Sequence, residues 1–206
     1  MIVNLREIPG NLPKDLCEHL IQKFEESDDV APGVSGNRNV DTSVKQSMDL
    51  RINERDWVDE CNFINERLFY AVDPMMREHH ELLRLNFPNG CLSHSGFQIQ
   101  KTQPGETGYI WHSDELYHYE KFGDKQVPMR RYITYLWYLN DGHGGNTEFF
   151  DRVVEPECGK LILFWADPSM IHRGIPPTNG NKYIMTGWVS TEMMYHENQP
   201  VFNPST

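Results

Sequence analysis

The sequence has no long hydrophobic run and little positive charge. No stretch approaches the roughly 18 consecutive apolar residues that a membrane-spanning helix needs. With 19 Lys and Arg against 30 Asp and Glu, the formal net charge is -11. This balance disfavours binding to nucleic acid or to anionic lipid, since both need concentrated positive charge. We therefore expect neither a nucleic acid nor a membrane among the partners of this protein.

Cysteine is also scarce. The four cysteines, Cys17, Cys61, Cys91 and Cys158, are widely scattered and form no C-x-x-C pair. This spacing excludes a zinc knuckle and a thioredoxin-like motif, and it favours buried free thiols. The first residues lack the apolar run and cleavage site of a secretory signal, so the sequence predicts a reducing, cytoplasmic location.

The length of 206 residues is that of one ordinary domain. No internal repeat is visible, which excludes solenoids and propellers. We expect a single domain over 1–206, in which 1–90 is mainly helical support, 91–192 is a β core and 193–206 is a C-terminal tail.

Two N-terminal segments have apolar residues at every third or fourth position, which predicts amphipathic helices. The first helix should cover 13–27, and the second should begin near Asn53. Pro74 is expected to kink the second helix or to begin a new one. Between them, 25–44 is rich in Ser, Asp, Gly and Asn, which predicts a long loop.

After Asn89-Gly90 the apolar runs become short, aromatic and β-branched, and turn signals separate them. Strands do not alternate with helices, so a doubly wound parallel sheet is disfavoured. The pattern predicts a mainly β (α+β) fold, an antiparallel sandwich or barrel with helices packed outside it. The strand candidates are 92–102, 106–113, 131–140, 146–150, 160–166, 170–174 and 182–192.

Two histidines and an aspartate are candidate metal ligands. His112 and Asp114 stand at i, i+2 on a predicted strand, so both side chains point to one face. A third ligand has to come from another strand, and His172, at the end of an apolar segment, is the strongest candidate. Two imidazoles and one carboxylate are the facial triad of non-haem Fe(II) oxygenases.

A His-x-acid pair also arises by chance in a chain with nine histidines. His118 and Glu120 have the same spacing, but they lie in the charged segment 115–130, which we interpret as a solvated loop. Loops 25–44 and 115–130 are candidate lids over a substrate.

Lys182 follows His172 by ten residues on a strand where Ile184, Thr186 and Trp188 share its face. A buried cation needs an anionic partner, because an unpaired charge in an apolar site is costly. A dicarboxylate cosubstrate would supply that partner. The alternative is a lysine whose amine reaches the surface.

The order and spacing of His112-x-Asp114, His172 and Lys182 resemble the prolyl 4-hydroxylase-like branch of the Fe(II)/2-oxoglutarate-dependent oxygenases. The resemblance extends from about Gln98 to Val189. It implies a double-stranded β-helix (jelly-roll) core with supporting N-terminal helices. Three further segments contribute to it: RYITYLWYLN at 131–140, GGNTEF at 144–149 and TGW at 186–188.

The resemblance also implies an activity. It is the hydroxylation of a C–H bond, coupled to the conversion of 2-oxoglutarate and O2 to succinate and CO2, with ascorbate as a further candidate cofactor. The substrate that it favours is a prolyl residue in a peptide or protein. Three alternatives stay open: a free amino acid or other small molecule as the substrate, a cupin-like metal hydrolase or isomerase, and a binding module on an inactive oxygenase scaffold.

The resemblance assigns roles to individual residues. His112, Asp114 and His172 would bind Fe(II). Gln103 stands where the family usually has a tyrosine that contacts the cosubstrate, and we expect it to retain a hydrogen bond there. The other implied cosubstrate residues are Lys182, Thr134, Tyr138 and Thr186. The implied substrate residues are Tyr109, Trp188 and Arg131, of which Arg131 is also a candidate partner of nearby carboxylates.

Overall fold

The computed structural model describes residues 4–35, 39–83 and 92–192. The expected tail 193–206 and the expected turn at Asn89-Gly90 lie outside these residues. Within them the chain forms two α-helices, one 3-10 helix and sixteen strands. In chain order they are β1 Leu5–Ile8, α1 Lys14–Glu25, β2 Ala31–Pro32, β3 Lys45–Gln46, β4 Met48–Arg51, α2 Val58–Leu83, β5 Leu92–His94, β6 Gln98–Thr102, β7 Gly108–His112, β8 Tyr117–Phe122, β9 Lys125–Tyr138, β10 His143–Gly144, β11 Thr147–Phe149, β12 Val153–Val154, β13 Leu161–Trp165, η1 Pro168–Met170, β14 His172–Gly174, β15 Pro177–Asn179 and β16 Lys182–Glu192.

The strands form a large sheet and a smaller one, with antiparallel pairing. The large sheet has the order β1-β13-β9-β16-β6-β4-β2, with β5 beside β16 and β8 beside β9. The small sheet has the order β12-β11-β14-β7-β3, and β10 pairs with β15. This arrangement confirms the predicted mostly β fold with a jelly-roll core and two supporting helices.

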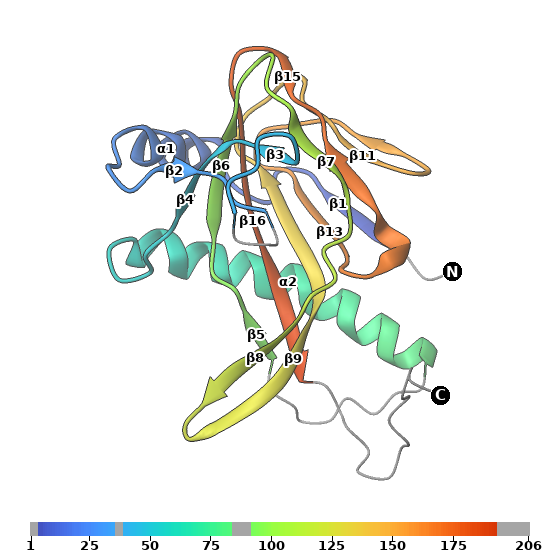
Figure 1. The fold of residues 1–206 in the computed structure, drawn as a ribbon. Helices are drawn as coiled ribbons and strands as arrows, with labels where there is room; N and C mark the ends of the chain where they lie inside the picture. The colour runs from blue at the N-terminus through green and yellow to red at the C-terminus, as the bar shows by residue number, and fades with distance from the viewer. Residues whose placement is uncertain (1–3, 36–38, 84–91, 193–206) are drawn as a thin grey trace.

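The two faces of the large sheet have different surroundings, because side chains alternate along each strand. Tyr135, Trp137 and Met185 are fully buried in the cluster that also contains the apolar residues of α1 and α2. In Figure 1, α2 runs across the back of this sheet. Thr134 and Trp188, which are paired in register, belong to the opposite face. That face carries the polar residues of the site.

Helix α2 continues through Pro74. A proline removes one backbone hydrogen bond from a helix. Pro74 lies on the exposed side of α2, where water can bond the freed carbonyl group. Of the two predicted alternatives, a kink or a new helix, the new helix is therefore wrong.

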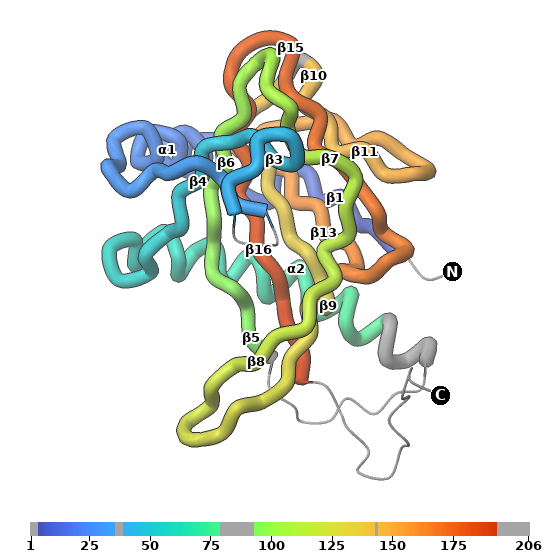
Figure 2. Tube along the Cα trace, viewed as in Figure 1, coloured from blue at the N-terminus to red at the C-terminus, as the bar shows by residue number. Residues whose placement is uncertain are grey.

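The predicted loop over 115–130 was also wrong. Tyr117–Phe122 and Lys125–Tyr138 form the hairpin β8–β9, which extends beyond the rest of the sheet (Figure 2). Gly123, with a φ of +60°, stands at its turn, as a two-residue hairpin loop requires. The charged and aromatic residues of this segment alternate along an exposed strand, a pattern that resembles a polar loop.

The N-terminal part contributes strands that the sequence did not predict. β1 extends the large sheet beside β13, and β2 lies within the expected loop 25–44. The chain then joins the small sheet through β3 and the large sheet through β4. This segment therefore bridges the two sheets beside the site.

Candidate metal centre

A β-bulge in β7 shapes the site. Between the pairs His112↔His172 and Tyr109↔Gly174, β7 has two residues where β14 has one. Such a bulge changes the direction of side chains, and here the rings of Tyr109 and His112 stack with centroids 3.6 Å apart. Gly108 has a φ of +71°, and a Cβ there would collide with the carbonyl oxygen of Gly174. The close approach of the two strands therefore requires glycine at 108.

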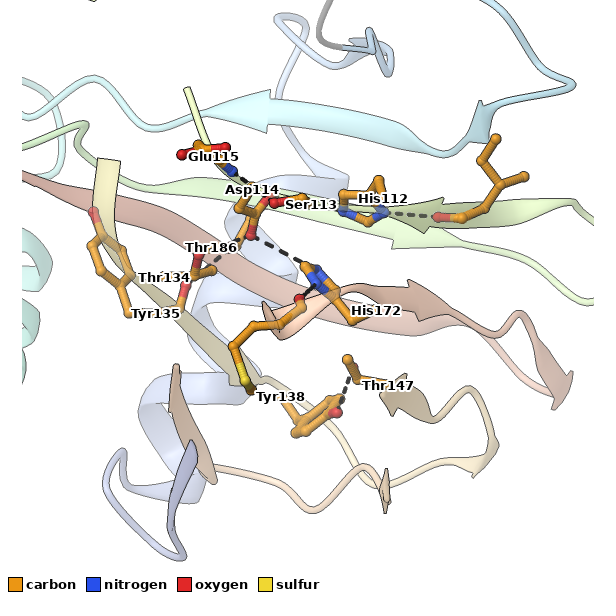
Figure 3. A network of polar contacts seen from close by, with 12 residues as sticks. His112, Ser113, Asp114, Glu115, Thr134, Tyr135, Tyr138, Thr147, His172 and Thr186 are labelled. Atoms are coloured by element: carbon orange, nitrogen blue, oxygen red, sulfur yellow. Dashed lines mark hydrogen bonds and ion pairs between the residues drawn. The ribbon is translucent and has the colours of Figure 1, made fainter. Parts of the chain in front are cut away.

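The structure brings the three predicted metal ligands together (Figure 3). Nε2 of His112 lies 3.8 Å from Oδ1 of Asp114, and Nε2 of His172 lies 3.7 Å from Oδ2. The ligand atoms of all three residues are within 4.8 Å of one another. Ligand atoms this close together could hold one metal ion.

Backbone carbonyl groups orient both imidazoles. Nδ1 of His112 lies 2.7 Å from the carbonyl oxygen of Ile110, and Nδ1 of His172 lies 3.0 Å from that of Met170. Because a carbonyl oxygen only accepts, each Nδ1 carries the proton. The lone pair of each Nε2 is thus directed toward the cluster, as in protein metal sites.

Thr134 on β9 contacts the carboxylate of the cluster. Its Oγ1 donates a 2.8 Å hydrogen bond to Oδ2 of Asp114. The resemblance had implied that this hydroxyl holds the cosubstrate. In the structure it holds a candidate metal ligand in place, and its contact with the cosubstrate stays a prediction.

The protonation of the cluster favours a cation. Burial, together with the neighbouring His172, lowers the pKa of His112 from 6.5 to about 4. Burial alone would raise the pKa of Asp114, but His172, His112 and the Thr134 hydrogen bond bring it below its ordinary value. At neutral pH the cluster therefore offers a neutral His112 and an ionised Asp114.

Lys182 is buried, with 6% of its surface exposed. Among the described residues it has no carboxylate partner, and its Nζ lies 5.9 Å from the ring centroid of Tyr138. Burial lowers its pKa from 10.5 to about 8. Gly145 has a φ of +75°, and a Cβ there would lie 3.1 Å from Cδ of Lys182. An uncompensated buried cation of this kind is suited to an anionic ligand.

Two further residues with implied cosubstrate roles have partners within the protein. The hydroxyl of Tyr138 donates to Oγ1 of Thr147 at 2.7 Å. The hydroxyl of Thr186 donates to the carbonyl oxygen of Tyr135 at 2.9 Å. The ring of Tyr138 still lines the surroundings of Lys182, whereas its hydroxyl points to Thr147 (Figure 3).

The position of Gln103 does not support the expected cosubstrate contact. Gln103 is exposed in the turn between β6 and β7, where its backbone N–H donates to Oε2 of Glu106. The β6 residue in register with Lys182 is Thr102. Directly paired residues of antiparallel strands share a face. β6 ends at Thr102, so Gln103 lies beyond the strand in the turn that follows, and the sequence spacing to His112 concealed this difference.

The implied substrate residues lie beside the cluster. The guanidinium of Arg131 stacks on the ring of Trp188 at 3.5 Å, and Tyr109 stacks on His112. Burial lowers the pKa of Arg131, although Asp114 partly offsets this effect. No carboxylate among the described residues forms an ion pair with Arg131. Its guanidinium donors therefore remain available to a ligand.

Sequence reasoning missed a polar cluster next to these residues. The carboxylate of Asp49 accepts hydrogen bonds from Lys45, Ser47 and Gln98. Residues 45, 47 and 49 stand at i, i+2 and i+4, which is a strand signal. The expected long loop just before them concealed that signal.

Comparisons with known proteins agree with this geometry. Residues 97–190 match the family model described as the 2OG-Fe(II) oxygenase superfamily. "Probable prolyl 4-hydroxylase 8" of Arabidopsis thaliana is 26% identical over an alignment of 208 positions that covers 86% of this chain. The chain spans 65% of the length of that curated relative.

Two solved structures share the fold. A prolyl hydroxylase from Trichoplax adhaerens, in complex with a hypoxia inducible factor peptide fragment, has a TM-score of 0.64 at 20% identity, covering 90% of this chain and 83% of its own. The viral collagen prolyl hydroxylase of Paramecium Bursaria Chlorella virus-1, in a 2OG complex, has a TM-score of 0.61 at 19% identity, covering 91% and 96%. Among the described residues, neither helix is long and apolar enough to cross a membrane.

Proposed function

Because residues 97–190 belong to the 2OG-Fe(II) oxygenase superfamily, we propose that the protein hydroxylates a prolyl residue of a peptide or protein, with Fe(II) and 2-oxoglutarate. Dioxygen would be the second cosubstrate, and ascorbate would keep the iron reduced. Succinate and CO2 would be the co-products.

The observation that carries this proposal is the buried Lys182 without an anionic partner, in the same domain as the His-Asp-His cluster. His112, Asp114 and His172 would hold Fe(II), because two imidazoles and a carboxylate leave coordination positions free. The ammonium of Lys182 would bind the distal carboxylate of 2-oxoglutarate in a charge-assisted contact. Bound iron and cosubstrate would supply the oxidising chemistry.

The chain itself would orient the reactants and exclude water. The backbone carbonyl groups of Ile110 and Met170 hold the two imidazoles, and Thr134 holds the carboxylate. These contacts fix the ligands before any substrate arrives, which is how neighbouring hydrogen bonds tune a metal site. The apolar surroundings of Lys182 would strengthen its attraction to a carboxylate.

The substrate would bind against Tyr109 and the Arg131–Trp188 stack. A prolyl residue offers an apolar ring and a carbonyl acceptor but no backbone N–H. The ring suits the aromatic faces of Tyr109 and Trp188, and the carbonyl suits the free donors of Arg131. The name of the curated relative supports the same substrate class.

A free amino acid is the second candidate substrate. The observation that favours it is the buried guanidinium of Arg131, which has no carboxylate partner among the described residues. A carboxylate would bind a guanidinium in a bidentate manner. The same atoms could thus recognise either a peptide carbonyl or a free carboxylate.

The test is the formation of succinate with and without Fe(II), in the presence of a proline-containing peptide library or of free amino acids. We expect iron-dependent succinate with prolyl peptides and none with His172→Ala. Turnover of amino acids alone would replace the peptide proposal by the second candidate. A metal hydrolase or isomerase would release no succinate and would remain active after Lys182→Ala.

A further inference from the structure

The buried ion pair between Lys45 and Asp49 connects the two sheets. Lys45 belongs to β3, which pairs with β7 in the small sheet, and Asp49 belongs to β4, which pairs with β6 in the large sheet. Nζ of Lys45 donates to Oδ2 of Asp49 at 2.6 Å. The chain crosses from one sheet to the other between these two residues (Figure 2).

Every acceptor of this pair is used. Oδ1 of Asp49 accepts from Ser47 at 2.7 Å, and Oδ2 accepts also from Gln98 at 2.5 Å. Gly33 allows this packing, because a Cβ there would collide with Oγ of Ser47. A buried ion pair contributes little net stability, because desolvation of both charges offsets their attraction. A positional role accounts better for its presence.

The pair reaches the metal centre through one aromatic ring. Lys45 is in register with Tyr109, and its Nζ lies 5.8 Å from the centroid of the Tyr109 ring. The same ring stacks on His112, with the two ring centroids 3.6 Å apart at an interplanar angle of 19°. The order Asp49, Lys45, Tyr109, His112 therefore joins the bridging segment to a candidate iron ligand.

We propose that Lys45, held by Asp49, is a positioning residue that keeps Tyr109 stacked on His112 and so fixes the wall against which the substrate binds. This proposal deepens the proposed function, and its substrate consequence rests on that function. Loss of the ammonium releases Tyr109 from its cation–π contact and leaves Asp49 buried without a counter-charge. The substrate then loses an oriented surface. Lys182 and the hydrogen bonds that orient the three candidate metal ligands are unchanged.

The chain contains a matched control. Lys101 donates to Oε1 of Glu25 at 2.8 Å, and its Nζ lies 5.8 Å from the ring centroid of Tyr183. It therefore has the same combination of a carboxylate and a tyrosine ring. On β6, Lys101 stands between Gln100 and Thr102, so its side chain points to the opposite face from theirs. Lys101 therefore faces away from the site.

The test measures the ring current of Tyr109 at His112 by NMR, in the full chain loaded with diamagnetic Zn(II) in place of Fe(II). The His112 proton shift in Tyr109→Leu defines the complete loss of stacking. We expect Lys45→Met to move that shift at least halfway toward the Tyr109→Leu value, and Lys101→Met to leave it unchanged. A folded Lys45→Met protein with the wild-type shift would overturn the proposal.

A second variant and a kinetic measurement complete the test. Asp49→Asn retains the volume of the side chain, so it replaces Lys45→Met in the test if that variant fails to fold. The same change in the His112 proton shift is expected. In turnover, Lys45→Met should raise the KM for a prolyl peptide by about tenfold or more, with the KM for 2-oxoglutarate unchanged, and Lys45→Arg should recover most of the loss. Equal effects on both KM values would show a merely structural role. A wild-type protein that hydroxylates no prolyl peptide would contradict the proposed function alone, because the NMR result does not depend on turnover.

Discussion

Thr134 donates a 2.8 Å hydrogen bond to Oδ2 of Asp114, the carboxylate of the His-Asp-His cluster. Both residues are buried. The carboxylate follows β7 of the small sheet, whereas Thr134 lies on β9 of the large sheet. This hydrogen bond therefore connects the candidate ligand to the large sheet and helps to orient its carboxylate.

The variant Thr134→Val retains the shape of the side chain and removes this hydrogen bond. We expect metal affinity to fall by about 10–100-fold, the usual effect of losing a group that orients a ligand. The measurement is a Mn(II) or Fe(II) titration of the metal-free protein, with Thr191→Val as a buried threonine control on β16. Unchanged metal affinity with weakened 2-oxoglutarate binding would show that Thr134 contacts the cosubstrate instead.

Lys182→Met should stabilise the protein without ligands and impair its function. Burial depresses the pKa of Lys182 from 10.5 to about 8, so keeping the amine charged at pH 7 costs up to about 3 kcal/mol. Urea unfolding should show a gain of that order, while the affinity for 2-oxoglutarate falls steeply because the charge-assisted contact is lost. Lys101→Met, which breaks an ion pair, should show no gain in stability. A destabilised Lys182→Met protein with intact 2-oxoglutarate binding would contradict this role.

Gly145→Ala tests the space beside Lys182. Alanine at a φ of +75° is strained by about 1–2 kcal/mol, and its Cβ would also lie 3.1 Å from Cδ of Lys182. Gly123→Ala is the matched control, because Gly123 has a φ of +60° and nothing within 4 Å of a Cβ. Both variants should lose stability, but only Gly145→Ala should weaken 2-oxoglutarate binding. Equal binding in the two variants would mean that Lys182 adjusts without consequence.

The stability of the metal-free protein should fall between pH 6.5 and pH 4. The pKa of His112 is about 4 in the folded state, against an ordinary value of 6.5. In this window the unfolded chain binds more protons, so unfolding becomes easier as pH falls, by up to about 3 kcal/mol in total. Urea midpoints across this range should show a smaller slope in His112→Asn than in wild type. The same slope in His112→Asn and wild type would exclude His112 as the cause.

The metal ligands could be predicted from sequence because they depend on simple local geometry. The i, i+2 spacing of His112 and Asp114 predicts a common face, and His172 follows closely after the apolar strand β13, which has to pair within the same core. The anion-binding role of Lys182 was predicted from the cost of burying an unpaired cation. The structure shows that Lys182 is buried.

The roles of Thr134 and Gln103 could not be predicted in the same way. Thr134 bonds a residue twenty positions away, on a different sheet, and no periodicity encodes that contact. Counting back from His112 pointed to Gln103, but alternation along β6 places Thr102 opposite Lys182. The bulge that stacks Tyr109 on His112 depends on a mismatch between two strands, which appears only when both are paired.

The most direct test of the central claim uses heavy-oxygen-labelled O2. The purified protein is incubated with Fe(II), 2-oxoglutarate and a prolyl peptide, and both products are analysed by mass spectrometry. We expect one labelled oxygen atom in the proline ring of the peptide and one in succinate, in equal amounts, and neither product with His172→Ala. Succinate without labelled peptide, or a modified peptide without succinate, would contradict it.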